Sequence, residues 1–193
     1  MTLPLAARKA LFDKIRIIKG DGLLQSEVDA IDAILNGQTG MKASPKATAF
    51  IHGFETLRLV SYKDPGSKNG LPITNGWGTT VDDNGKAIPL GATWSREKAD
   101  RLFARDFAEF EAAVAELVHE RSTTQAQFDA MISLAYNIGV PAFSKSTLLR
   151  KHLAGDFAGA AAEFPRWNQN DGKVMAGLTR RRAGERAMYE GRA

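Results

Sequence analysis

Two carboxylates in one short segment are the residues of this sequence best suited to chemistry. Glu55 lies where a predicted helix ends, so the negative end of the helix dipole disfavours its ionised form, and the apolar neighbours Phe54 and Leu57 add desolvation. Both effects favour the protonated carboxyl that a general acid needs. Asp64 lies among turn residues and is expected to be solvated and ionised. A glycosidase uses two carboxylates kept in different protonation states, whereas the alternative is a turn aspartate and a solvated glutamate without catalytic roles.

Other common catalytic and cofactor motifs are incomplete in this chain. The sequence has no Cys, which excludes disulfides, thiol nucleophiles and thiolate metal sites. Gly76-Trp77-Gly78 begins a dinucleotide fingerprint, but Val81 stands where the third glycine belongs. His119-Glu120 begins a zinc-protease motif, but Thr123 replaces its second histidine. We therefore predict no metal site and no cofactor.

The composition is that of an ordinary globular protein. The 193 residues are 44% hydrophobic and 25% charged, which excludes disordered and collagen-like classes. The formal net charge of +4 permits an anionic partner without selecting one. The N-terminus lacks a signal-peptide pattern, and charges interrupt every apolar run well before the roughly 18–20 residues of a membrane span. We therefore expect no signal peptide, no transmembrane segment and no stable membrane insertion.

The elements that must position Glu55 and Asp64 begin with a short helix. Ser44-Pro45 has the N-cap and first-turn signature of a helix that runs to His52-Gly53. Ahead of it, apolar residues at helical spacing predict helices within 4–19 and 26–36. We expect residues 1–43 to form an N-terminal helical element of unknown role, and residues 44–193 to form the catalytic domain.

The rest of the chain predicts a sheet followed by helices. Alternating and turn-rich sequence over 56–92, with a hairpin signal at Asp82-Asp83-Asn84-Gly85, predicts a small antiparallel sheet lobe. From residue 93 onward the apolar spacing is helical: Ser95 opens a long helix, Thr124 has capping-box spacing with Gln127, and Gly139 ends that second helix. Shorter helices are expected over 147–153, 156–164 and 178–189. This order predicts an α+β fold with segregated elements.

The segment around the two carboxylates resembles a known family. Glu55 to Asp64, read as E-T-L-R-L-V-S-Y-K-D, is similar to the catalytic segment of the phage-type lysozymes, the muramidase family of the T-even phage lysozyme (glycoside hydrolase family 24). The stretch 74–80, T-N-G-W-G-T-T, fits the T-x-G-x-G-x-T motif that follows there. Ala135-Tyr136-Asn137-Ile138-Gly139 and the residues 177–185 resemble later blocks. The resemblance covers about residues 44–189 and implies a lysozyme-like fold.

The resemblance implies a reaction and three catalytic roles. It implies hydrolysis of the β-1,4 bond between N-acetylmuramic acid and N-acetylglucosamine in peptidoglycan. Glu55 is then the general acid, Asp64 acts on the water, and Thr74 positions that water. It also implies inversion, for which the carboxyl groups lie ~6.5–9.5 Å apart rather than the ~5–5.5 Å of a retaining pair.

The sequence departs from the family pattern at two positions. Thr56 stands where the family commonly has Gly, and a positive φ there would strain a threonine. Thr74 lies further from Asp64 than the family spacing, which is consistent with a longer hairpin tip over residues 67–71. Thr79 or Thr80 is therefore the alternative to Thr74.

Four further residues are candidates for supporting roles. Trp77 and Asn137 are candidate substrate contacts, although packing for the tryptophan and helix capping for the asparagine are the alternatives. The resemblance places the C-terminal helix near the active site, so Arg181 and Arg182 are candidates to support Glu55. The alternative for this basic run is a solvated helix face.

The expected cellular role is host lysis by an endolysin. The resemblance implies accumulation in the bacterial cytoplasm until a holin-type membrane protein allows release to the peptidoglycan, and we expect a monomer that does not bind nucleic acid. A lytic transglycosylase needs one acid and no water-activating carboxylate, so it is the nearest enzymatic alternative. A non-catalytic module for wall or nucleic acid is the other alternative, and the basic residues 180–182 are its only support.

Overall fold

The computed structural model describes residues 13–15, 41–63, 69–119 and 121–192. The chain divides into two compact units, Met1–Gly40 and Met41–Ala193. In the first unit the described residues, 13–15, are helical, and the rest of the helices predicted there lies outside the described residues. The predicted boundary after residue 43 stays a prediction. Within the described ranges, no helix combines the length and the apolar character that crossing a membrane requires.

Helix α3 (Pro45–His52) leads to Glu55. Pro45 fits the first turn because its missing N–H would have no partner there. Ser44 is the N-cap by position, but its side chain does not cap the helix. Its N–H donates to Asp129 Oδ1 at 2.9 Å and its hydroxyl donates to Oδ2, which ties the start of α3 to helix α5 (Gln125–Ile138).

A small antiparallel sheet follows, as predicted. Strands β1 (Arg58–Lys63) and β2 (Ile73–Gly76) pair with Tyr62 opposite Thr74, and the register shifts toward Arg58. Isolated bridges join Val60 to Thr93 and Val81 to Ala87, so the remainder of the sheet lobe is built mainly from turns.

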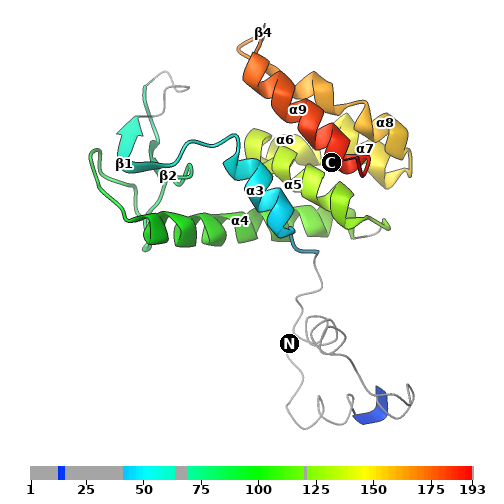
Figure 1. The fold of residues 1–193 in the computed structure, drawn as a ribbon, viewed down its shortest axis with the longest axis horizontal. Helices are drawn as coiled ribbons and strands as arrows, with labels where there is room; N and C mark the ends of the chain where they lie inside the picture. The colour runs from blue at the N-terminus through cyan, green and yellow to red at the C-terminus, as the bar shows by residue number, and fades with distance from the viewer. Residues whose placement is uncertain (1–12, 16–40, 64–68, 120, 193) are drawn as a thin grey trace. The chain divides into compact units, whose positions relative to one another are not determined.

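Helix α4 (Arg96–Val118) connects the sheet to the helices, and Figure 1 shows it running beneath both. The Ser95 hydroxyl accepts the Lys98 N–H at 3.2 Å and caps the helix, as predicted. Its 23 residues span about 34 Å at 1.5 Å per residue. Its buried apolar face includes Leu102, Phe103 and Phe107.

The helical lobe is built around α5. The predicted capping box at Thr124 and Gln127 is present, Gly139 ends the helix with φ 84°, and every residue from 127 to 135 is buried. Helix α9 (Ala176–Tyr189) packs along α5. The remaining elements are α6 (Val140–Ser144), α7 (Thr147–Leu153), α8 (Phe157–Ala161), the 3₁₀ helix η1 (Phe164–Trp167), β3 (Gln169–Asn170) and β4 (Lys173–Val174).

Two features of the helical lobe differ from the prediction. The segment 156–164 is not one helix, because the ring of Pro165 would clash with the Ala161 carbonyl in a continued helix, and α8 ends at Ala161 before η1 begins at Phe164. The β3–β4 hairpin was not predicted. Its turn residues Asp171 and Gly172 have φ of 47° and 74°, as a two-residue type I′ turn requires. The α+β architecture itself is confirmed.

Candidate active site

Glu55 lies just beyond the end of α3, with its side chain half-buried. Its N–H donates to Ile51 O at 3.1 Å, which continues the helical pattern by one turn. Its carboxylate accepts a hydrogen bond from Arg181 Nη1 at 2.8 Å, and its side chain is 27% exposed. Phe54, expected as an apolar shield, is itself exposed, and the Arg181 guanidinium lies 5.6 Å from its ring centroid. The group that faces the Glu55 carboxylate is therefore a cation.

The two candidate supporting arginines are buried in the helical lobe. Arg181 is 3% exposed and joins Glu55 to Glu185, whose carboxylate lies 3.2 Å from its Nε. Arg182 is 1% exposed and donates to Glu185 and to the Trp167 carbonyl. A solvated face is therefore the wrong interpretation for both. Of the two, Arg181 has the recorded bond to Glu55.

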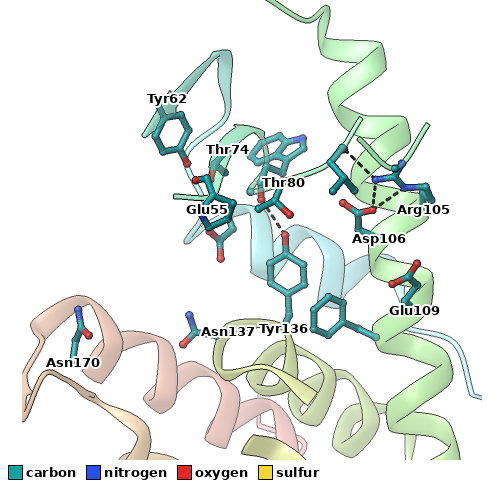
Figure 2. Close-up of a pocket in the computed structure, with 16 residues that line it drawn as sticks. Glu55, Tyr62, Thr74, Thr80, Arg105, Asp106, Glu109, Tyr136, Asn137 and Asn170 are labelled. Carbon is teal, nitrogen blue, oxygen red and sulfur yellow. Dashed lines mark hydrogen bonds and ion pairs between the residues drawn. The ribbon is translucent and has the colours of Figure 1, made fainter. Parts of the chain in front are cut away.

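Thr74 lies in β2 and faces the same cavity as Glu55 (Figure 2). It is 8% exposed, and its hydroxyl donates to Pro72 O at 3.3 Å, a long bond that a better acceptor could replace. Thr80 lines the cavity as well, whereas Thr79 is buried and pairs through its backbone with Asn75. The structure therefore brings Thr74 and Thr80, of the three candidate threonines, to the cavity.

Asp64 follows Lys63, the last residue of β1, and lies outside the described residues. The separation of the two candidate carboxylates thus stays a prediction. The strain considered for Thr56 does not arise, because Asp171 is the non-glycine residue with a positive φ in the described part of the chain.

Two adjoining cavities meet at Glu55. One of about 930 Å³ lies between the sheet and α4, and one of about 840 Å³ lies between α9 and the segment that follows α3. Glu55, Asn137 and Asn170 line both. Together they form a groove that passes Glu55 on both sides, as a site acting within a polymer requires.

Trp77 and Asn137, the candidate substrate contacts, have different environments. The Trp77 ring is 7% exposed, stacks on His52 at 3.9 Å between centroids, and donates its indole N–H to Asp100 at 2.6 Å. The Trp77 carbonyl accepts the Tyr136 hydroxyl at 3.0 Å. Packing thus accounts for most of Trp77, although it lines the first cavity. Asn137 is exposed where the two cavities meet.

Helix α4 adds charged residues that the sequence analysis did not select. Asp106 and Glu109 line the first cavity and project from α4 on the side opposite Glu55 and Thr74 in Figure 2. Asp106 is ion-paired with Arg105, which also donates to the Asp82 carbonyl at 2.7 Å. The signal for the acidic pair was its three-residue spacing, which places both side chains on one helix face.

Two titratable side chains close to Glu55, His52 and Tyr136, are neutral near pH 7. Burial lowers the pKa of His52, with smaller opposing contributions from Asp100 and Glu55. Burial raises the pKa of the Tyr136 phenol above its ordinary value, and the charge of Glu55 adds to this effect. Neither side chain therefore competes with Arg181 as the charged partner of Glu55 at neutral pH.

Comparison with known proteins identifies the family. The phage lysozyme family model matches residues 52–185. An endolysin of Bacillus phage B103 is 38% identical over 149 residues, covering 77% of this chain and 54% of its own length. The chain thus spans about half the length of this relative. An endolysin of Acyrthosiphon pisum secondary endosymbiont phage 1 is 35% identical, covering 78% of this chain and 99% of its own length.

A solved structure agrees with this assignment. The endolysin from Escherichia coli O157:H7 phage FAHEc1 superposes with a TM-score of 0.68 at 36% identity, covering 77% of this chain and 93% of that one. The lysozyme-like fold predicted from the sequence is therefore confirmed. The family match spans the helix end that carries Glu55, the sheet lobe and the helix that carries Arg181. The chain belongs to the phage lysozyme family.

Proposed function

We propose that this protein is a muramidase that hydrolyses the β-1,4 bond between N-acetylmuramic acid and N-acetylglucosamine in peptidoglycan. The observation that carries the proposal is the half-buried Glu55 carboxyl where two adjoining cavities meet. A glycan chain is a polymer cut internally, so its acid catalyst must lie within a continuous groove. The endolysin relatives support the same substrate.

In the proposed mechanism, Glu55 gives its proton to the leaving glycosidic oxygen while oxocarbenium character develops on the sugar. Asp64 and Thr74 hold a water on the opposite face of the ring, Asp64 as its base and Thr74 as a hydrogen-bonding partner. This arrangement inverts the anomeric configuration. The exposed amide of Asn137 is suited to bonding the sugar substituents, whereas Trp77 shapes the wall.

The direct test compares Glu55→Gln and Asp64→Asn with the wild type on purified peptidoglycan. Removing a general acid costs about 10²–10⁴-fold, so Glu55→Gln should lose nearly all activity while remaining folded. Glu109→Gln, which changes a second carboxylate of the same cavity, is the matched control and should retain most activity. Wild-type clearing by Glu55→Gln would show that Glu55 is not the acid.

The products report on the chemistry. NMR of the first product should show inverted anomeric configuration at the new reducing end. Retained configuration would contradict the water-activating role of Asp64. A 1,6-anhydro product would instead identify a lytic transglycosylase.

The proposed cellular role is lysis of a bacterial host. The protein is a monomer that accumulates in the cytoplasm, and a holin-type membrane protein releases it to the wall. Expression in a bacterial host should leave growth unchanged until the membrane is permeabilised, and then cause rapid lysis. Deletion of residues 1–40 tests the role of the N-terminal segment: lost wall binding with an intact fold indicates binding, and lost stability indicates packing.

A further inference from the structure

Four charged side chains of alternating sign run inward from the groove. Glu55 accepts from Arg181, and Arg181 Nε lies 3.2 Å from Glu185 Oε1. The other oxygen of Glu185 lies 2.7 Å from Arg182 Nε, and Arg182 Nη2 donates to Oε1 at 2.8 Å. Glu185 thus links Arg181, which contacts Glu55, to a second buried arginine, Arg182.

Water is largely excluded from the inner part of this cluster. The Glu185 side chain is 0% exposed, and those of Arg181 and Arg182 are 4% and 1% exposed. Ser133 of α5, also fully buried, donates its hydroxyl to Glu185 Oε1 at 2.7 Å, and its carbonyl accepts from Arg181 at 3.3 Å. Charges in such a site act on one another more strongly than charges on the surface.

The charge balance of the cluster depends on Glu185. With Glu55 ionised, the two carboxylates offset the two guanidinium groups. With Glu55 protonated, the cluster carries one positive charge, and without Glu185 it would carry two. Two uncompensated cations in this buried cluster, one of them in contact with Glu55, would strongly favour its ionised form, which cannot donate a proton.

We propose that Glu185 is a positioning residue for the reaction, which holds Arg181 in place and offsets its charge so that Glu55 can keep the proton it donates. The proposal rests on the function proposed above, in which Glu55 is the acid. Glu185 contacts no substrate and acts through Arg181 alone.

None of the other described titratable groups around Glu55 offsets the charge of Arg181 as Glu185 does. His52 at the end of α3 and Tyr136 at the end of α5 are both neutral near pH 7, for the reasons given above. The remaining titratable groups of the described cavity walls are Tyr62, Arg105, Asp106, Glu109 and Arg180. Arg105 and Asp106 are paired with each other, and Arg180 and Glu109 are exposed to solvent, which screens their charges.

A charge-compensation series tests the proposal through the pH dependence of kcat/KM on peptidoglycan. Glu185→Gln leaves both arginines unbalanced, so the alkaline limb, where the acid loses its proton, should move about one pH unit lower. Arg182→Met leaves Arg181 as the only arginine of the cluster paired with Glu185, so the alkaline limb should move to higher pH. The double variant Glu185→Gln/Arg182→Met restores the balance and should return the limb close to its wild-type position.

A purely structural role predicts a different result. Both single variants would then lose activity at every pH, with no opposed displacement of the limb and no return in the double variant, and that result would overturn the proposal. If Glu185→Gln fails to fold, Arg182→Met and the double variant still decide the question, because exchanging a whole buried pair for neutral groups is better tolerated than breaking it.

A spectroscopic readout separates this inference from the proposed function. The Glu55 carboxyl resonance in ¹³C-glutamate-labelled protein is the one missing from Glu55→Gln. Its titration midpoint should fall in Glu185→Gln and rise in Arg182→Met, whatever the role of Glu55. Unmoved midpoints overturn the role of Glu185, whereas moved midpoints with a fully active Glu55→Gln overturn the proposed function alone.

Discussion

The two walls of the groove are built in opposite ways. On the helical wall, Glu55 is bound by Arg181, a residue 126 positions away in the sequence, and the ion pairs continue into the core. On the sheet wall, Thr74 comes from a hairpin, and its hydroxyl has one long bond to a carbonyl two residues away. One wall is fixed by buried charge, and the other presents a nearly free hydroxyl.

This difference matches the two tasks that the proposed reaction sets. The ionisation of an acid depends on charges and on their distances, so it requires side chains that cannot move. A water-binding hydroxyl needs only freedom to turn toward its partner. We therefore expect changes on the helical wall to alter both stability and catalysis, and changes on the sheet wall to alter catalysis with little effect on stability.

The largest effect should follow the loss of Arg181. Arg181→Met breaks a buried pair and should cost about 3 kcal/mol of unfolding free energy. Lost orientation of Glu55 should also lower kcat by about 100-fold. Urea unfolding and a peptidoglycan clearing assay measure the two effects. Arg186→Met, which breaks the exposed pair with Glu190, is the matched control and should cost less than about 0.5 kcal/mol. Equal effects of the two changes would contradict the claim that the buried ion pairs fix the helical wall.

Trp77 joins the two walls, because its ring packs against α3 while its indole N–H bonds to α4. Trp77→Ala should cost about 3 kcal/mol through the cavity it leaves. Trp77→Phe keeps a ring against His52 and loses the bond to the exposed Asp100, so it should cost about 1 kcal/mol. Thermal unfolding and KM, measured together, separate the possible roles. A raised KM with unchanged stability in Trp77→Phe would indicate a substrate contact.

The helical lobe should also be the more sensitive to acid. His152 of α7 is fully buried between the Tyr189 and Thr123 hydroxyls, at 2.6 and 2.9 Å. Because the Thr123 hydroxyl donates to the Arg121 carbonyl, it accepts from His152 Nε2, and Tyr189 donates to Nδ1. Protonation of His152 would require the Tyr189 hydroxyl to turn from donor to acceptor, and burial lowers the pKa of His152 to about 4, with a smaller contribution from Arg121.

The sign of the pH effect follows from this lowered pKa. Between about pH 6.5 and 4 the unfolded chain binds a proton at His152 that the folded protein does not, so stability is lost as pH falls through this range. The loss should reach about 2–3 kcal/mol. Urea unfolding at pH 7, 5.5 and 4.5 should show this loss of stability in the wild type. The control His119→Gln, which changes an exposed histidine, should show the same loss. A His152→Gln variant with the same pH dependence as the wild type would contradict the prediction.

The smallest effect should come from the sheet wall. Thr74→Val removes the hydroxyl at nearly constant volume and should lower kcat about 10-fold, with a stability change below about 1 kcal/mol. Thr74→Ser keeps the hydroxyl and should stay close to wild type. If Thr80→Val loses more activity than Thr74→Val, then Thr80 is the water-positioning residue.

The helix boundaries show what could be predicted from sequence. The start of α4 and both ends of α5 were found because a cap acts within three or four residues, as at Ser95, Thr124 and Gly139. The β3–β4 hairpin carried an equally local signal, Asp171-Gly172 between two short strands, and the prediction overlooked it. Ser44 had the sequence pattern of an N-cap, but its N–H and its hydroxyl donate to the Asp129 carboxylate of α5 instead.

The sequence by itself determined the candidate carboxylates and the order of elements, because residue type, turn chemistry and apolar spacing are written along the chain, and the family resemblance implied the candidate threonines. It also determined the family, through ordered motifs from Glu55 to Glu185. Only the tertiary structure decided which arginine contacts Glu55, and that the same arginine also contacts the buried Glu185. The sequence of an arginine run does not show whether its side chains face water or a carboxylate. Burial distinguishes these two cases, and it depends on how α9 packs against α3 and α5.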